Sequence, residues 1–86
     1  MYVIVEHTIT DPEAFGAATA SAEIPPHLTL HQVLPGADGS HQVCLWEGPS
    51  EDAVRQFVEG GVGHASRNVY VAVDAEKAMG LPVAAS

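Results

Sequence analysis

Apolar and polar residues alternate in four segments of this 86-residue chain, and apolar residues recur at helical spacing in two others. The alternating segments span residues 2–9, 27–34, 40–47 and 66–74 and are rich in branched side chains, which predicts four strands. Turn-forming residues at 35–39 separate the second strand from the third, so these two strands are expected to form a hairpin.

Two helices are expected in the intervals that follow the first and third strands. Thr10 or Asp11 caps the first helix, Pro12 suits its first turn, and Pro25-Pro26 ends it. Ser50 caps the second helix. The glycines expected to end that helix are Gly60, Gly61 and Gly63. The apolar residues that the two helices are expected to bury are Phe15, Ala18, Ala22, Val54, Phe57, Val58 and Val62.

The predicted order of elements is β-α-β-β-α-β, the ferredoxin-like arrangement of the α+β class. Both crossover connections are expected to be right-handed, so the two helices cover the same face of a four-stranded antiparallel sheet. Residues 1–86 are expected to form one domain, because 86 residues are too few for two. Residues 74–79 are expected to form a helical turn, and residues 80–86 a C-terminal tail that frays over Val83 to Ser86.

Each strand contributes one set of side chains to each face of the sheet, because side chains alternate along a strand. A uniformly aliphatic set is expected to pack beneath the helices: Val3, Val5, Leu28, Leu30, Val43, Leu45, Val69, Val71 and Val73. The other set is mixed: Tyr2, Ile4, Glu6, His27, Thr29, His31, Val33, Cys44, Trp46, Asn68 and Tyr70. A sheet face with aromatic and aliphatic residues and no helix to cover it indicates an interface or a ligand site.

We therefore expect a homodimer in which two copies lie face to face and enclose a space between their sheets. Composition supports this expectation, because only 16% of the residues are charged against a usual value of about 25%. A chain of this size also buries only about 60–65% of the surface that its unfolded form exposes, so self-association would stabilise it.

In strand order, length and the mixed character of its second sheet face, the chain resembles the dimeric α/β-barrel superfamily of small ferredoxin-like proteins. That superfamily includes cofactor-independent aromatic monooxygenases, polyketide cyclases, dehalogenase-like and stress proteins, haem-degrading enzymes and small metal-binding members. The resemblance implies a fold and a homodimer, and it extends over nearly the whole chain. It implies no single activity, because one fold carries many functions.

Charge excludes several classes of function. Three basic residues against eleven acidic ones give a net charge of −8, and Arg55, Arg67 and Lys77 are scattered, so nucleic acids and anionic membranes are not expected as partners. Cys44 is the only cysteine, which excludes an internal disulfide and a cysteine-based zinc cluster. The first residues read as a strand and not as a signal peptide, and no apolar run is long enough to span a bilayer, so a cytoplasmic protein is expected.

Glu6 and His31 are the first candidates for chemistry. Both belong to the mixed set, where they could converge across a cavity with Trp46 between them. A carboxylate in a partly apolar cavity has its pKa raised, and a histidine beside it is suited to act as acid or base. The alternative is an interfacial ion pair that orients the two subunits.

A second group of side chains suits a flat aromatic ligand. Trp46, Tyr2 and Tyr70 offer rings, and the hydroxyl of Tyr70 adds a third candidate catalytic group to Glu6 and His31. The expected ligand-binding residues are Tyr2, Ile4, Val33, Cys44, Trp46 and Asn68. Aromatic packing at a dimer interface is the alternative, since interfaces favour Tyr and Trp. Cys44 is expected to be a small buried hydrophobic residue and not a nucleophile.

No cofactor is expected. His27 and His31 stand four residues apart on a strand, about 13 Å, and cannot share one metal ion. His7, His41 and His64 lie at element ends and are expected to be solvated. A transition metal at Glu6 and His31, completed by the dimer mate, is a secondary hypothesis, and haem ranks below it because few basic residues could hold propionates.

Three functions compete at this point. The first is a small-molecule pocket on the sheet face, used for acid–base chemistry on an aromatic or polyketide-like substrate: cyclisation, isomerisation or cofactor-free oxygenation. The second is a non-catalytic protein that binds a metal or a metabolite. The third is a structural module whose second face serves only to dimerise.

Overall fold

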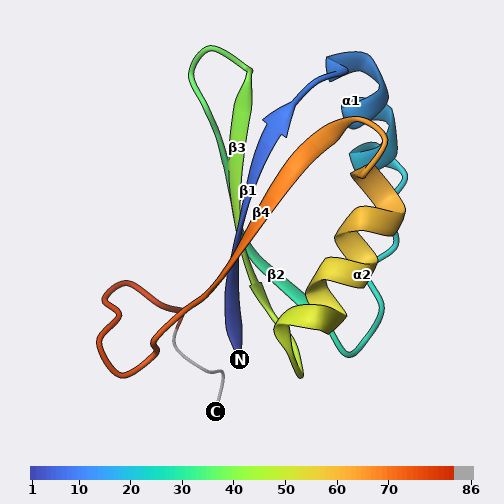
Figure 1. The fold of residues 1–86 in the computed structure, drawn as a ribbon. Helices are drawn as coiled ribbons and strands as arrows, with labels where there is room; N and C mark the ends of the chain where they lie inside the picture. The colour runs from blue at the N-terminus through green and yellow to red at the C-terminus, as the bar shows by residue number, and fades with distance from the viewer. Residues whose placement is uncertain (83–86) are drawn as a thin grey trace.

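The elements follow one another in the order that the sequence predicts, in a computed structural model that describes residues 1–82 (Figure 1). They are β1 (Tyr2–Ile9), α1 (Pro12–Ala20), β2 (Thr29–Pro35), β3 (His41–Glu47), α2 (Glu51–Val62) and β4 (Ser66–Ala72). The strands form one antiparallel sheet in the order β2-β3-β1-β4, and both helices lie on the same face of it (Figure 1). This is the ferredoxin-like arrangement. The expected fraying of Val83 to Ser86 falls outside the described residues.

The helix starts are confirmed and the helix ends are corrected. Asp11 and Ser50 cap α1 and α2, each accepting a hydrogen bond from the backbone three residues on. Helix α1 ends at Ala20, five residues before Pro25. Helix α2 continues through Gly60 and Gly61 to Val62, so the prediction that these two glycines end it is wrong.

The pairing register decides which side chains lie beneath the helices. Residues directly opposite one another in a ladder share a face, and Val3 pairs with Trp46 while Val5 pairs with both Cys44 and Tyr70. The faces predicted for β3 and β4 are therefore wrong. The face of the sheet that carries no helix is called the uncovered face below. Five residues predicted for it lie instead on the helix side: Val33, Cys44, Trp46, Asn68 and Tyr70. Val43, Leu45, Val69 and Val71, predicted for the helix side, lie on the uncovered face.

A β-bulge interrupts β2. Leu30 pairs with Trp46 and Gln32 with Leu45, so His31 is an extra residue in the ladder. Its ring lies 5.6 Å from the ring of Tyr2, which places His31 on the uncovered face. After the bulge, Val33 pairs with Cys44 and therefore faces the helices.

The core lies between the helices and the middle of the sheet. Val3, Val5 and Val54 are completely buried there. The rings of Trp46 and Phe57 meet edge to face, with centroids 5.7 Å apart. Within residues 1–82, no helix is long and apolar enough to cross a membrane.

After β4 the chain continues antiparallel to the first strand as far as Val73 and then turns near Asp74. The Val73 amide donates to the Tyr2 carbonyl at 3.0 Å, and the expected turn near Asp74 is present, with the Ala78 amide donating to the Asp74 carbonyl at 3.0 Å. The Tyr2 hydroxyl lies 3.5 Å from the carbonyl oxygen of Pro82. This segment lies on the side of the sheet away from the helices (Figure 1).

Candidate functional site: a cavity between the sheet and the helices

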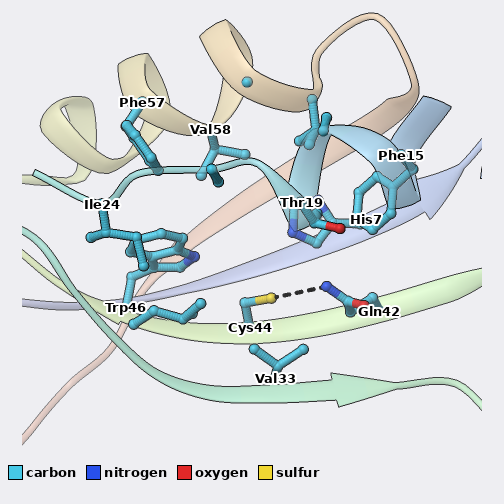
Figure 2. Close-up of a pocket in the computed structure, with 15 residues that line it drawn as sticks. His7, Phe15, Thr19, Ile24, Val33, Gln42, Cys44, Trp46, Phe57 and Val58 are labelled. Carbon is cyan, nitrogen blue, oxygen red and sulfur yellow. Dashed lines mark hydrogen bonds between the residues drawn. The ribbon is translucent and has the colours of Figure 1, made fainter.

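A cavity of about 280 Å³ lies between the sheet and the two helices. It extends over β1, β2 and β3, and no β4 residue lines it. Its walls are mostly apolar and are formed by His7, Phe15, Ala18, Thr19, Ala22, Ile24, Leu30, Val33, Gln42, Cys44, Trp46, Phe57, Val58, Gly61 and Val62 (Figure 2).

Small side chains explain why this space is open. Helix α1 is only nine residues long and carries Gly16, Ala17, Ala18 and Ala20 after its single buried aromatic residue, Phe15. Protein interiors are otherwise close-packed, with few voids larger than one water molecule, whose share of liquid volume is about 30 Å³. The space here is partly open to solvent, since Ile24 and Val33 in its walls are 43% and 46% exposed, and its volume of about 280 Å³ lies near the lower end of the range for ligand pockets.

His7 is the polar residue that the structure places deepest at the site. Its side chain follows Val3 and Val5 on the helix side of β1, and only 4% of its surface is exposed. Its Nδ1 lies 2.6 Å from Asn68 Oδ1 on β4. The expectation that His7 is a solvated residue at the end of a strand is wrong.

The hydrogen bonds around Asn68 fix the protonation of the His7 ring. The amide nitrogen of Asn68 donates to Glu59 Oε2 at 2.7 Å, and the Tyr70 hydroxyl donates to the same oxygen. The donated hydrogen bonds, first from Tyr70 and then from Asn68, lower the pKa of Glu59, so this carboxylate only accepts. The Asn68 oxygen must then face His7, and Nδ1 of His7 must carry the proton.

This arrangement leaves Nε2 of His7 as a proton acceptor. Asn68 holds the Nδ1 side of the ring toward β4, so the opposite edge is turned toward β3 and the cavity. Nε2 has no hydrogen-bond partner within residues 1–82. Burial lowers the pKa of His7 below its ordinary value of 6.5, against the opposing effects of Asn68 and Glu59. The neutral ring with a bare Nε2 is the form that can accept a proton.

Trp46 presents the opposite hydrogen-bonding character. Its indole is 5% exposed, and its Nε1–H is a buried donor without a partner in the described part of the chain. A buried donor without a partner costs about 1–3 kcal/mol, so natural proteins rarely keep one without a reason. Figure 2 shows the indole nitrogen on the side of the ring turned toward Cys44 and His7, and the nitrogen itself has almost no accessible surface.

Cys44 lies between these two groups, and Gln42 lies beside His7. Gln42 pairs with His7 in the ladder, so their side chains are neighbours at one end of the cavity. The Gln42 amide donates to Cys44 Sγ at 3.4 Å. Because thiol sulfur is a weak acceptor, an oxygen of a ligand can take its place as the acceptor of this hydrogen bond. Burial raises the pKa of the Cys44 thiol, which keeps it protonated and unreactive.

The cavity contains no cationic side chain. Arg55 lies over the Tyr70 ring on the outer side of α2 at 4.7 Å, and Arg67 and Lys77 are exposed elsewhere. The acidic partner of the network, Glu59, is exposed and contacts the cavity only through Asn68 and His7. The walls therefore offer hydrogen bonds without a counter-charge for an anion.

Four of the site residues predicted from the sequence lie on the uncovered face, but Glu6 and His31 do not lie close together. Tyr2, Ile4, Glu6 and His31 lie on that face. His31 Nε2 lies 2.8 Å from Glu47 Oε1, so its partner is Glu47 and not Glu6. Glu6 stands four residues along β1 from Tyr2, about 13 Å away from the His31 end of the strand. Trp46 does not lie between them, because it belongs to the other face.

The remaining predicted residues divide between the cavity and its supporting network. Val33, Cys44 and Trp46 line the cavity, whereas Asn68 and Tyr70 hold Glu59 at its side. The residues that sequence reasoning missed are His7, Gln42 and Glu59. A signal for His7 existed, because it continues the alternation of Val3 and Val5.

No group of three or more His, Cys, Asp or Glu side chains that could hold a metal ion occurs within residues 1–82. No protein-family model, curated protein or solved structure matches this chain. Fold and site together define a ferredoxin-like α+β protein with a mostly apolar cavity between its sheet and its helices.

Proposed function

We propose that this protein binds a small, neutral, mostly aromatic molecule in the cavity between its sheet and its helices, and that His7 accepts a proton from it. The observation that carries the proposal is the buried, unpaired Nε1–H of Trp46 in a cavity that also holds the neutral imidazole of His7. A ligand would supply a partner to each group, together with a shift of the indole that brings its buried nitrogen to the cavity surface.

The walls of the cavity support a neutral ligand. A net charge of −8 repels anions, and no Lys or Arg lines the cavity. Burying an ionised group without a partner costs far more than a ligand of this size could recover. Phosphorylated and carboxylated molecules are therefore poor candidates.

The spacing of the polar groups supports a ligand with two separate polar ends. Trp46 pairs with Val3, which stands four residues from His7 on β1, about 13 Å along the strand. Figure 2 shows Trp46 and His7 toward opposite ends of the cavity with Cys44 between them. A ligand that reaches both needs an acceptor at one end and a hydroxyl at the other.

The two ends have different roles in this proposal. At the Trp46 end, the indole N–H donates to a carbonyl or ether oxygen and anchors the ligand. At the other end, a phenolic or enolic hydroxyl donates to His7 Nε2, and the Gln42 amide can turn from Cys44 to support the oxygen that gains negative charge. Proton removal of this kind suits isomerisation, cyclisation or cofactor-free oxygenation of a phenolic or polyketide-like substrate.

The proposal includes a homodimer formed through the uncovered face, as in the dimeric α/β-barrel superfamily. Val69, Val71 and Leu34 are exposed on that face, 45–56% each, and no helix of residues 1–82 covers them. The same face carries Glu6 and Arg67, which form no ion pair within the described chain. One unpaired acid and one unpaired base on a single face suit a two-fold interface, in which each copy meets the complementary charge of the other.

Calorimetric titration with three related ligands tests the binding site. 4-Hydroxyacetophenone has both polar ends, acetophenone lacks the hydroxyl, and 4-ethylphenol lacks the carbonyl. Because a buried hydrogen bond contributes about 1 kcal/mol, we expect each of the two truncated ligands to bind about fivefold to tenfold more weakly than the first.

Two variants assign the contacts. His7→Asn keeps a donor toward Asn68 and removes Nε2, so 4-hydroxyacetophenone and acetophenone should then bind equally well. Trp46→Phe removes the indole donor, so 4-hydroxyacetophenone and 4-ethylphenol should then bind equally well. If the truncated ligands bind wild-type protein as tightly as the full one, the two polar ends have no role and the proposal fails.

A further inference from the structure

The cavity adjoins a second hollow on the outer surface. This hollow of about 410 Å³ lies where α1 and the residues after it meet α2, and it is lined by Ala18, Ser21, Ala22, Glu23, Gln56, Phe57, Gly60 and Gly61. Four residues line both spaces: Ala18, Ala22, Phe57 and Gly61. The two spaces therefore lie side by side between the helices, and these four residues form the junction between them.

Three of the four shared residues have little or no side chain. Gly61 stands in the last turns of α2, where a glycine lowers the stability of the helix relative to alanine. A Cβ atom at Gly61 would meet no atom within 4 Å, so neither backbone conformation nor close packing requires a glycine there. The space that a side chain would occupy is the junction of the two hollows.

Phe57 is the one large side chain among the four shared residues, and it connects the junction to Trp46. Its ring is half-buried, lines both spaces, and contacts the indole of Trp46. The indole that carries the unpaired Nε1–H therefore packs against the residue that forms the wall of the junction. This second observation separates the junction from a simple stripe of small residues.

We infer that the ligand enters and leaves between α1 and α2, and that Gly61 is the residue that keeps this passage open. The inference rests on the proposed function in that it takes the cavity to be the binding site. It adds the route, and it assigns to the missing side chain of Gly61 a role in the rate of exchange.

The chain contains a matched series of helical glycines for the test. Gly16, Gly60 and Gly61 all lie within helices, and a Cβ atom at any of the three would meet nothing within 4 Å. Gly16 lines neither hollow, Gly60 lines only the outer one, and Gly61 lines both. Substitution by leucine at each position should raise the melting temperature, because leucine favours a helix over glycine.

Collisional quenching of tryptophan fluorescence by acrylamide measures how readily a small molecule reaches Trp46, and it needs no bound ligand. The signal is specific because Trp46 is the only tryptophan. We expect Gly61→Leu to lower the quenching constant severalfold, Gly16→Leu to leave it at the wild-type value, and Gly60→Leu to have at most a small effect. Equal quenching in Gly61→Leu and wild-type protein would show that small molecules reach the cavity by another route and would overturn the inference.

Stopped-flow mixing with 4-hydroxyacetophenone, followed by Trp46 fluorescence, separates the passage from the binding site. We expect Gly61→Leu to slow association and dissociation together, whereas a change confined to dissociation would assign Gly61 to the binding surface and count against a passage. If the wild-type protein does not bind the ligand, the proposed function fails, while the acrylamide result still decides on the passage.

Discussion

His7 and Asn68 face each other across β1 and β4, with 2.6 Å between Nδ1 and Oδ1. The amide group of Asn68 connects the exposed carboxylate of Glu59 to the buried imidazole of His7 through hydrogen bonds, so that no charged group lies directly against the ring. A carboxylate in direct contact would favour the protonated ring. The amide instead orients the ring and leaves it neutral.

The role of this amide can be tested by charging it. Asn68→Asp keeps an acceptor opposite His7 Nδ1 but adds a negative charge, which should raise the pKa of His7 relative to the wild-type protein. NMR titration of the His7 ring protons measures this. Adding Glu59→Gln to Asn68→Asp removes the like charge beside the new carboxylate and serves as the control. An unchanged His7 pKa in both variants would contradict the contact.

The lowered pKa of His7 also predicts how stability depends on pH. The unfolded chain binds a proton at His7 near the ordinary pKa of 6.5, whereas the folded protein binds it only at lower pH. The free energy of unfolding should therefore decrease as the pH falls through the unfolded pKa, and this decrease should end once the folded pKa is passed. Urea unfolding from about pH 8 to about pH 5 measures it. His7→Asn should show a smaller decrease than the wild-type protein over the same range.

The unpaired Nε1–H of Trp46 should lower the free energy of unfolding of the protein without ligand, and a ligand that accepts this hydrogen bond should restore it. Trp46→Phe deletes the unpaired donor while keeping a ring in the core, so we expect the free energy of unfolding to change by no more than about 1 kcal/mol. Trp46→Ala should lose about 3–5 kcal/mol, because it leaves a large additional cavity. Urea unfolding of both variants gives the comparison. A loss in Trp46→Phe as large as that in Trp46→Ala would indicate that the indole nitrogen has a partner.

The proposed dimer predicts a selective effect of one exposed substitution. Val69 is 56% exposed in the single chain, so Val69→Lys should change the stability of a monomer by no more than about 0.5 kcal/mol. In a dimer it buries a charge on each side of the interface. Native mass spectrometry should show twice the chain mass for wild-type protein and one chain mass for Val69→Lys. Ala17→Lys, at an exposed position of α1 on the helix side of the molecule, should remain a dimer.

The order of elements could be predicted because its signals are local. The caps at Asp11 and Ser50 and the turn near Gly39, whose φ of 78° suits a glycine, each depend on a few adjacent residues. Right-handed crossovers then place both helices on one face. These rules needed no information about pairing between strands.

The faces of β3 and β4 could not be predicted because, in each strand, both side-chain sets mix apolar and polar residues. Leu45 and Trp46 are adjacent in β3 and both are buried, one on each face of the sheet. Alternation separates two such sets without assigning either to a face, and only the register with Val3 on β1 makes that assignment. The cavity was missed for the same reason, since Cys44 and Trp46 were assigned to the wrong face.

The bulge at His31 also affects the outer edge of the sheet. Strand β2 is an edge strand, and an exposed edge offers unpaired backbone groups on which further chains can assemble. The extra residue at His31 disrupts the regular spacing of those groups and twists the strand locally. The opposite edge, β4, pairs regularly from Ser66 to Ala72 and has no such protection. Uncontrolled strand addition, the first step toward fibrous aggregation, would therefore begin at β4 and not at β2.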